Sequence, residues 1–317
     1  MLVETEEIIT RHFPGAFKKM SEWKRLYPYA YSCYNSCPFQ FFCKYIFPHK
    51  VVTTHVLVVG KRCHAMKDIY YKRIKIETLS RMLEANESYE FISAYIMRHF
   101  LKAIHDDDER AVMQGFSNLE AKRLIGIKEA IGFDEKTLRK FYLPAFTEVT
   151  LKAGMFGGRL DTIFRCDDEE YMPLDWKDGQ SVPKQYKGET MLYDSIKTQM
   201  HIYGILIDDL GMEDTINGST WLVKASKYAV VYPRHELAVV KDFESFIKTT
   251  IRENIPEMLE NINDRYFPMQ IGEFTCGFGA GSYMPCECLD QVCKKLFVRD
   301  LGFTVAADGS VISGIEV

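Results

Sequence analysis

The chain has 317 residues, of which 47% are hydrophobic and 26% are charged, and its formal net charge is −4. This length and composition are typical of a globular protein with one elaborated α/β domain, or with a core domain and a helical addition. The absence of a run of about eighteen apolar residues excludes a membrane-spanning helix, and the acidic balance argues weakly against nucleic-acid binding through overall positive charge. The N-terminal stretch MLVETEEIITRHF lacks the apolar core of a signal peptide, so we expect a cytoplasmic protein with no membrane partner.

The first part of the sequence is predicted to be mainly helical. The aromatic-rich segment up to about residue 47 and the segment 61–74 have helical patterns, and the β-branched stretch 51–60 fits either a strand or the lead-in to a helix. Helical patterns continue over 77–139, interrupted by the charged stretch HDDDER (105–110), which we expect to be a loop. The stretch 77–139 therefore indicates a helical insertion.

A meander of short strands is predicted after Pro144. Alternating residues at 147–151, 159–166 and 171–177 indicate three strands, with turns at 154–158 and 167–170 between them. The remaining elements, in chain order, are a helix over 193–211, strands over 219–233 and 235–241, a helix over 243–264, and a hairpin over 303–313 with Asp-Gly at its turn.

Acidic side chains gather on the predicted meander. Asp161 lies on the second strand and Asp175 on the third, so antiparallel pairing can bring the two carboxylates together. With the imidazole of His64, they suit a hard divalent ion such as Mg²⁺ or Mn²⁺. Lys177 shares a strand face with Asp175; the pair alone would more often be a solvated ion pair. Glu148, on the first strand, is either a supporting acid of the site or an exposed one.

Four motifs occur in a fixed order: GxxxH (Gly60, His64), GRLD (158–161), DxK (175–177) and QxxxY (199–203). This series resembles the RecB-like branch of the PD-(D/E)XK nuclease superfamily, over about residues 30–293, with Leu174 where the superfamily's namesake proline would stand. The branch includes CRISPR-adaptation exonucleases, the nuclease domains of recombination helicase-nucleases, and phage exonucleases.

The resemblance implies an α/β, restriction-endonuclease-like core with a mixed central sheet flanked by helices. We expect a single nuclease domain over 1–317, with an N-terminal helical part (1–76), a helical insertion (77–143), a catalytic core (144–264) and a cysteine-rich segment with the C-terminal hairpin (265–317). The implied activity is that of a Mg²⁺- or Mn²⁺-dependent DNA exonuclease, acting in recombination, replication or repair, which also fits a phage-encoded enzyme.

The resemblance also implies roles for the motif residues. The expected metal ligands are His64, Asp161, Asp175 and the backbone carbonyl of Trp176. Lys177 would orient the attacking water and offset charge at the phosphate. Gln199 and Tyr203, which share a helix face, would contact DNA or hold Lys177.

Nine cysteines fall largely into two clusters, at 33–43 and 276–293. Clustered cysteines in a reducing compartment suggest metal or cluster ligation. The resemblance implies a structural 4Fe-4S cluster, with four thiolate ligands: Cys37, Cys276, Cys286 and Cys293. Cys288 is the alternative to Cys286, and Zn²⁺ is the alternative to the cluster. The others are expected to be buried small hydrophobes: Cys33, Cys43, Cys63 and Cys166.

The expected partner is DNA, single-stranded or with free ends. The basic run KRCHAMKDIYYKR (61–73) is a candidate surface for the DNA backbone. Four aromatics either stack on bases or pack in the core: Trp23, Tyr27, Tyr29 and Phe39. No helicase motif is present, so unwinding would come from a helicase or recombination partner. The alternative function is a catalytically weak or inactive nucleic-acid-binding subunit of a helicase-nuclease complex.

Overall fold

The computed structural model describes residues 2–3, 15, 17–18, 20–46, 55–167, 170–179, 182–210, 213–216, 219–222, 224–270, 304–305 and 311–312. The chain divides into two compact units, one formed by residues 52–251 and the other by 1–51 with 252–317. The first unit carries the four motifs. The predicted boundaries of a single nuclease domain stay a prediction.

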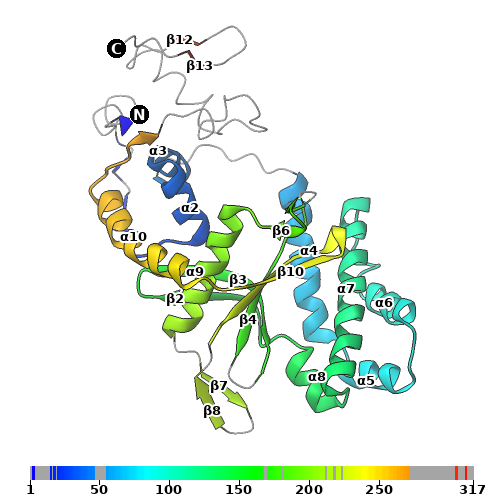
Figure 1. Cartoon of the computed structure of the whole chain (residues 1–317). Helices are drawn as coiled ribbons and strands as arrows, with labels where there is room; N and C mark the ends of the chain where they lie inside the picture. Colours follow the sequence, from blue (N-terminus) through cyan, green and yellow to red (C-terminus); the bar gives the residue numbers. More distant parts are fainter. Residues whose placement is uncertain are drawn as a thin grey trace. The chain divides into compact units, whose positions relative to one another are not determined.

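The 52–251 unit begins with five helices (Figure 1), namely α4 (His55–Arg73), α5 (Ile76–Glu84), α6 (Tyr89–Arg98), α7 (Asp107–Ile131) and α8 (Glu135–Phe141). Of the two interpretations of 51–60, the described part, from His55 onward, is the helical lead-in. The predicted loop at 105–110 is wrong from Asp107 onward, where α7 begins. Asp106 accepts a hydrogen bond from Glu109 N at 2.8 Å, so it caps α7, and the acids that follow lie at the positive end of the helix dipole.

A five-stranded mixed sheet forms the centre of this unit, in the order β10-β9-β4-β3-β2. Its strands are β2 (Phe146–Ala153), β3 (Phe156–Arg165), β4 (Tyr171–Trp176), β9 (Lys227–Tyr232) and β10 (Leu237–Asp242). β4 and β9 run parallel, and the other neighbours are antiparallel. The predicted meander is therefore confirmed as β2, β3 and β4, and the α/β class with a mixed sheet is confirmed as well.

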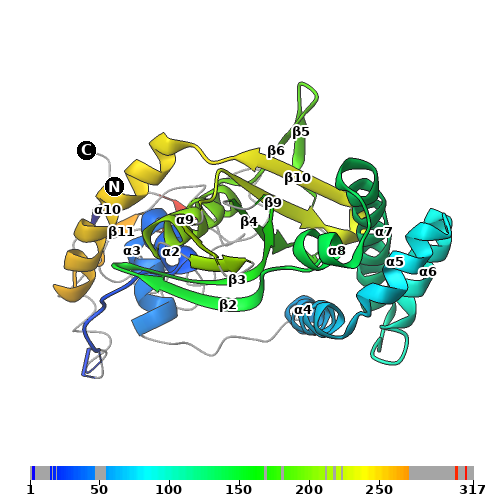
Figure 2. The ribbon, with the colours of Figure 1, turned by 90° about the horizontal axis from the view of Figure 1, so that it is seen from below.

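Helices cover both faces of the sheet, with α9 (Asp194–Leu210) on one side and α4 with α7 on the other (Figures 1 and 2). The helices α4–α8 share one hydrophobic cluster with sheet residues such as Phe164, Leu174 and Trp176. On the other side, α9 packs against β2, β3 and β4. The layers thus fix α4 and α9 against the same three strands, which is where the motifs lie.

The strand predicted over 219–233 is wrong as a single element. Its first part, β8 (Ser219–Leu222), pairs with β7 (Glu213–Ile216), whereas β9 belongs to the central sheet. A further hairpin, β5 (Lys184–Tyr186) with β6 (Glu189–Met191), follows the DxK motif and was not predicted.

The other unit contains α2 (Pro28–Ser36), α3 (Pro38–Phe41) and a π-helical turn (Phe42–Ile46), with small strand pairs β1–β11 and β12–β13. Its aromatic core includes Phe41, Phe42 and Phe267, all completely buried. α10 (Ser245–Asn263) runs across the boundary between the units in the sequence. The C-terminal hairpin prediction is confirmed, because Thr304 and Val305 pair with Ile312 and Val311.

Candidate metal and nuclease site

Three neighbouring strands each carry one acid of the site. The β2–β3 ladder pairs Thr147 with Thr162 and Val149 with Leu160, so Glu148 lies opposite Asp161. The β3–β4 ladder ends at Thr162 and Leu174, and Asp161 and Asp175 are the next residues on each strand. The predicted neighbourhood of Asp161 and Asp175 thus follows from strand register.

Glu148 has a left-handed backbone, with φ of +49°. This conformation is uncommon for a residue with a side chain and is costly, so such residues tend to persist where the surrounding structure enforces them, often at functional sites. It interrupts the regular ladder between Thr147 and Val149. The carboxylate of Glu148 reaches the same histidine as that of Asp161.

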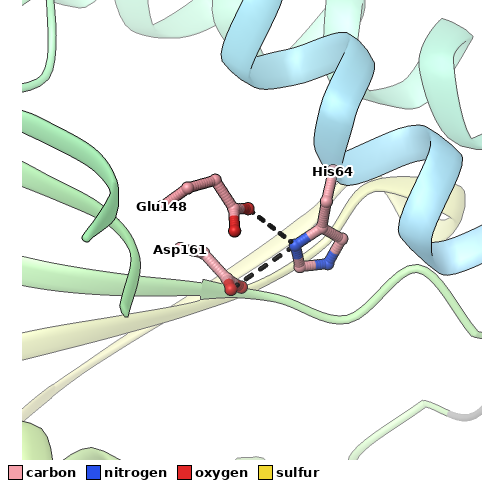
Figure 3. A group of neighbouring side chains, drawn as sticks. All are labelled: His64, Glu148 and Asp161. Carbon is pink, nitrogen blue, oxygen red and sulfur yellow. Dashed lines mark hydrogen bonds and ion pairs between the residues drawn. The ribbon is translucent and has the colours of Figure 1, made fainter. Parts of the chain in front are cut away.

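His64 meets both carboxylates with a single nitrogen (Figure 3). Its Nδ1 lies 3.3 Å from Glu148 Oε1 and 3.4 Å from Asp161 Oδ1. One ligand atom from each of the three residues lies within 4.8 Å of the others. Two carboxylate oxygens and an imidazole nitrogen at this spacing are a fitting donor set for a divalent cation. Among the described residues, this group is the candidate metal site.

The pKa values of His64 and Asp161 are both shifted by their contact with each other. Burial alone would lower the pKa of His64, but hydrogen bonds with Asp161 and Glu148 and the charge of Asp161 outweigh it and raise this pKa to about 10. Burial would raise the pKa of Asp161, but the hydrogen bond and charge of His64 keep it below its ordinary value. The metal-free site therefore holds an imidazolium between two carboxylates.

Asp175 belongs to a second chain of contacts, directed toward α9. Its Oδ2 lies 2.6 Å from Lys177 Nζ, and its Oδ1 accepts a hydrogen bond from Gln199 Nε2 at 2.8 Å. Gln199 Oε1 also accepts from Lys177 at 3.1 Å, and Gln199 Nε2 donates to Tyr203 Oη at 2.8 Å. Tyr203 Oη donates to the Arg159 carbonyl at 2.7 Å, which ties the helix to β3. The QxxxY residues thus hold the acid and lysine of DxK.

The two groups meet at Trp176. Its backbone N–H donates to Asp161 Oδ2 at 2.9 Å, and its indole N–H donates to Thr162 Oγ1 at 3.0 Å. The geometry thus brings together all the predicted motif side chains, with Glu148 rather than Asp175 in the closest group around His64. The role of the Trp176 carbonyl as a ligand stays a prediction.

Three residues beside the site were not singled out from the sequence. Arg159 Nη2 lies 2.7 Å from Glu148 Oε2. Lys67 and Asp178 form a buried ion pair, each side chain 2% exposed. Within the run 61–73, which was expected as a candidate surface for the DNA backbone, Lys67 is therefore enclosed and does not form part of an exposed surface. Its spacing of three from His64 on a helix indicates a shared face and could have revealed it.

The predicted cluster ligands are only partly within the described residues. Cys37 is buried at the junction of α2 and α3, whereas Cys276, Cys286, Cys288 and Cys293 lie outside the described residues. The expectation of buried cysteines is confirmed for Cys33, Cys43 and Cys63. It is wrong for Cys166, which is exposed because it directly follows the end of β3, where the chain turns.

The aromatics that were expected either to stack on bases or to pack in the core differ in burial. Phe39 is completely buried and packs on Phe42, so for this residue the core interpretation holds. Tyr27 and Tyr29 are exposed. Trp23 packs edge-on against Phe41.

The mixed sheet with helices on both faces, and the candidate divalent-metal site on its strands, fit a nuclease core, and the comparison with protein families agrees. The model of the PD-(D/E)XK nuclease superfamily matches residues 25–288. The chain belongs to this superfamily, which implies phosphodiester hydrolysis and a nucleic-acid substrate. No curated protein matches the chain. Among the helices of the described residues, none has the length and apolar character needed to span a bilayer.

Proposed function

We propose that the chain is a DNA exonuclease that uses Mg²⁺ or Mn²⁺ and acts in recombination, replication or repair. The observation that carries this proposal is the meeting of Glu148, Asp161 and His64 within 4.8 Å, next to the buried carboxylate of Asp175 on β4 and its ion pair with the half-buried Lys177. The proposed metal ligands are these three residues. Asp175, which lies on β4 beside Asp161 of β3, is the neighbouring acid of the site. When bound, a divalent ion would supply Lewis acidity at the scissile phosphate and lower the pKa of a water molecule.

Lys177 is the proposed catalytic cation. Its ammonium is held by Asp175 and by Gln199 Oε1, so its position does not depend on substrate. A positioned ammonium at the phosphate can orient the attacking water by hydrogen bonding and offset negative charge in the transition state. Gln199 donates a hydrogen bond to Asp175 and accepts one from Lys177. It therefore fixes the carboxylate and the ammonium relative to each other.

The activity is tested with end-labelled DNA, single- or double-stranded, and with circular single-stranded DNA, in Mg²⁺ or Mn²⁺. An exonuclease degrades the linear substrates and spares the circle. Asp161→Asn should reduce cleavage by about 10³-fold or more, since it removes a ligand charge. Asp208→Asn is the matched control, because Asp208 is an acid on α9 that pairs with Lys248. If wild-type protein binds Mn²⁺ but cleaves no DNA, the chain is instead an inactive nucleic-acid-binding subunit of a helicase-nuclease complex.

The same proposal includes a 4Fe-4S cluster held by Cys37, Cys276, Cys293 and either Cys286 or Cys288. The burial of Cys37 between two helices supports a structural role. Anaerobically purified protein should absorb near about 400 nm, as thiolate-bound iron does, and either Cys286→Ala or Cys288→Ala should abolish that band. A colourless protein that releases Zn²⁺ would indicate a zinc site instead.

A further inference from the structure

A buried acid lies behind the imidazole of His64, on the side away from the candidate metal ligands. While Nδ1 faces Glu148 and Asp161 (Figure 3), Nε2 lies 3.6 Å from Asp178 Oδ2. The side chain of Asp178 is 2% exposed. The two nitrogens of His64 thus face different carboxylates: Nδ1 faces the partly exposed Glu148 and Asp161, and Nε2 faces the enclosed Asp178.

The orientation of Asp178 is fixed by its other oxygen. Oδ1 accepts a hydrogen bond from the buried ammonium of Lys67, which also lies 4.8 Å from the centroid of the Trp176 ring. Oδ2 makes no hydrogen bond within the described part of the chain. A buried carboxylate oxygen without a hydrogen bond is costly, so it needs a donor. On that side, His64 Nε2 lies 3.6 Å from Oδ2 and is a possible donor to it.

We propose that Asp178 is a positioning residue, which holds His64 with Nε2–H directed at its carboxylate and Nδ1 open toward the metal. The inference rests on the proposed metal site. An imidazole binds a metal through one unprotonated nitrogen, and an acceptor behind the other nitrogen selects that tautomer, orients the ring and makes the ligand more basic. Lys67 supports the arrangement by holding Oδ1, so that Oδ2 remains directed at the ring.

Asp178→Asn tests the role, because an amide offers one acceptor where the carboxylate offers two. The ammonium of Lys67 can only donate, so it takes the amide oxygen, and the NH₂ group then faces Nε2–H. Two donors oppose each other when Nδ1 binds metal. Titration calorimetry on the full chain should show Mn²⁺ binding about 10–100-fold weaker than in wild type.

The double variant Lys67→Met/Asp178→Asn separates positioning from simple stabilisation. Without the ammonium, the amide can turn its oxygen to Nε2–H, so Mn²⁺ affinity should recover by at least about fivefold relative to Asp178→Asn alone. Lys67→Met/Asp178→Leu is the matched control, since leucine accepts no hydrogen bond and affinity should stay low. Thermal unfolding in EDTA, measured in parallel, records the stability that each variant loses.

The outcomes distinguish the inference from the function on which it rests. If the variants melt at lower temperatures but bind Mn²⁺ with the wild-type dissociation constant, the pair is only structural and the inference is overturned. Should Asp178→Asn fail to fold, equal Mn²⁺ binding by the two charge-neutral double variants overturns it as well. If the wild-type protein binds no Mn²⁺, the proposed metal site fails and the inference fails with it.

Discussion

The two motif glycines, Gly158 and Gly60, should respond to alanine in opposite ways. A Cβ atom added at Gly158 would lie 2.9 Å from Leu206 Cδ1 and 2.9 Å from Tyr203 Cε1. Leu206 can rotate its methyl groups away, but the Tyr203 ring is anchored by its hydrogen bonds with Arg159 O and Gln199 Nε2. At Gly60, an added Cβ would meet no atom within 4 Å among the described residues, apart from its chain neighbours and the backbone of its own helix.

The expected magnitudes follow from these contacts. Overpacking of this kind costs about 1–3 kcal/mol, so Gly158→Ala should lower the free energy of unfolding by that amount. Gly60 lies inside α4, where replacing glycine by alanine stabilises a helix by about 0.5–1 kcal/mol. A shift of Tyr203 would also displace Gln199 and with it Lys177, and a misplacement of about 1 Å can cost 10²-fold in rate.

Urea unfolding of the metal-free proteins measures both effects, and cleavage of end-labelled DNA measures the consequence at the site. Gly158→Ala should lose stability and activity together, whereas Gly60→Ala should gain stability. A Gly158→Ala protein with the wild-type unfolding midpoint would refute the argument that α9 packs too closely on β3 for a side chain. A Gly60→Ala protein that is more stable but cleaves poorly would place the requirement for that glycine at the substrate.

Three predictions concern pH. Burial is the main cause that raises the pKa of Asp175, to about 6. The folded state therefore binds a proton at a pH where the unfolded chain does not, so the melting temperature of wild type relative to Asp175→Asn in EDTA should rise as the pH falls from about 8 to 5. Burial lowers the pKa of His201, so the folded protein favours its neutral form. The stability that this form contributes is complete above the ordinary pKa of histidine and is lost as the pH falls below it. Between about pH 7.5 and 5.5, the melting temperature of His201→Gln should therefore fall by less than that of wild type. With its pKa of about 10, His64 must release a proton to bind metal, so calorimetry in two buffers should detect about one proton released per Mn²⁺ at pH 8, and release near zero would exclude His64 as a ligand.

The order of the catalytic strands could be predicted from the sequence because each strand carries its own signal. Alternating residues and intervening turns define 147–151, 159–166 and 171–177, and consecutive strands joined by short turns pair as antiparallel neighbours. That pairing suffices to bring Asp161 close to Asp175. The spacing of four between Gln199 and Tyr203 likewise places both on one helix face. These parts of the site depend on local periodicity, which a single sequence shows.

The remaining parts depend on tertiary contacts that periodicity does not encode. Glu148 reaches His64 because its backbone is left-handed. A glutamate in the sequence does not indicate that conformation. Lys67 is enclosed although it lies in a basic run, because Asp178 neutralises it from another element. The break between β8 and β9 similarly reflects pairing with β7 instead of the central sheet. Sequence patterns thus indicated which residues gather, but not which atoms face which.

The pairing of acids with bases explains how so acidic a site can fold before a metal ion arrives. Each buried or half-buried acid has a cation within 4 Å, in the pairs Glu148–Arg159, Asp161–His64, Asp175–Lys177 and Asp178–Lys67. Buried charges are tolerated when they are paired, whereas removal of one partner is strongly destabilising. The pairs differ in how readily they separate. The Arg159 side chain is 67% exposed, and an exposed ion pair contributes at most about 1 kcal/mol, so Glu148 can exchange its guanidinium for a metal ion at small cost. Lys67 and Asp178 cannot separate so easily, which makes them the fixed reference against which His64 is oriented.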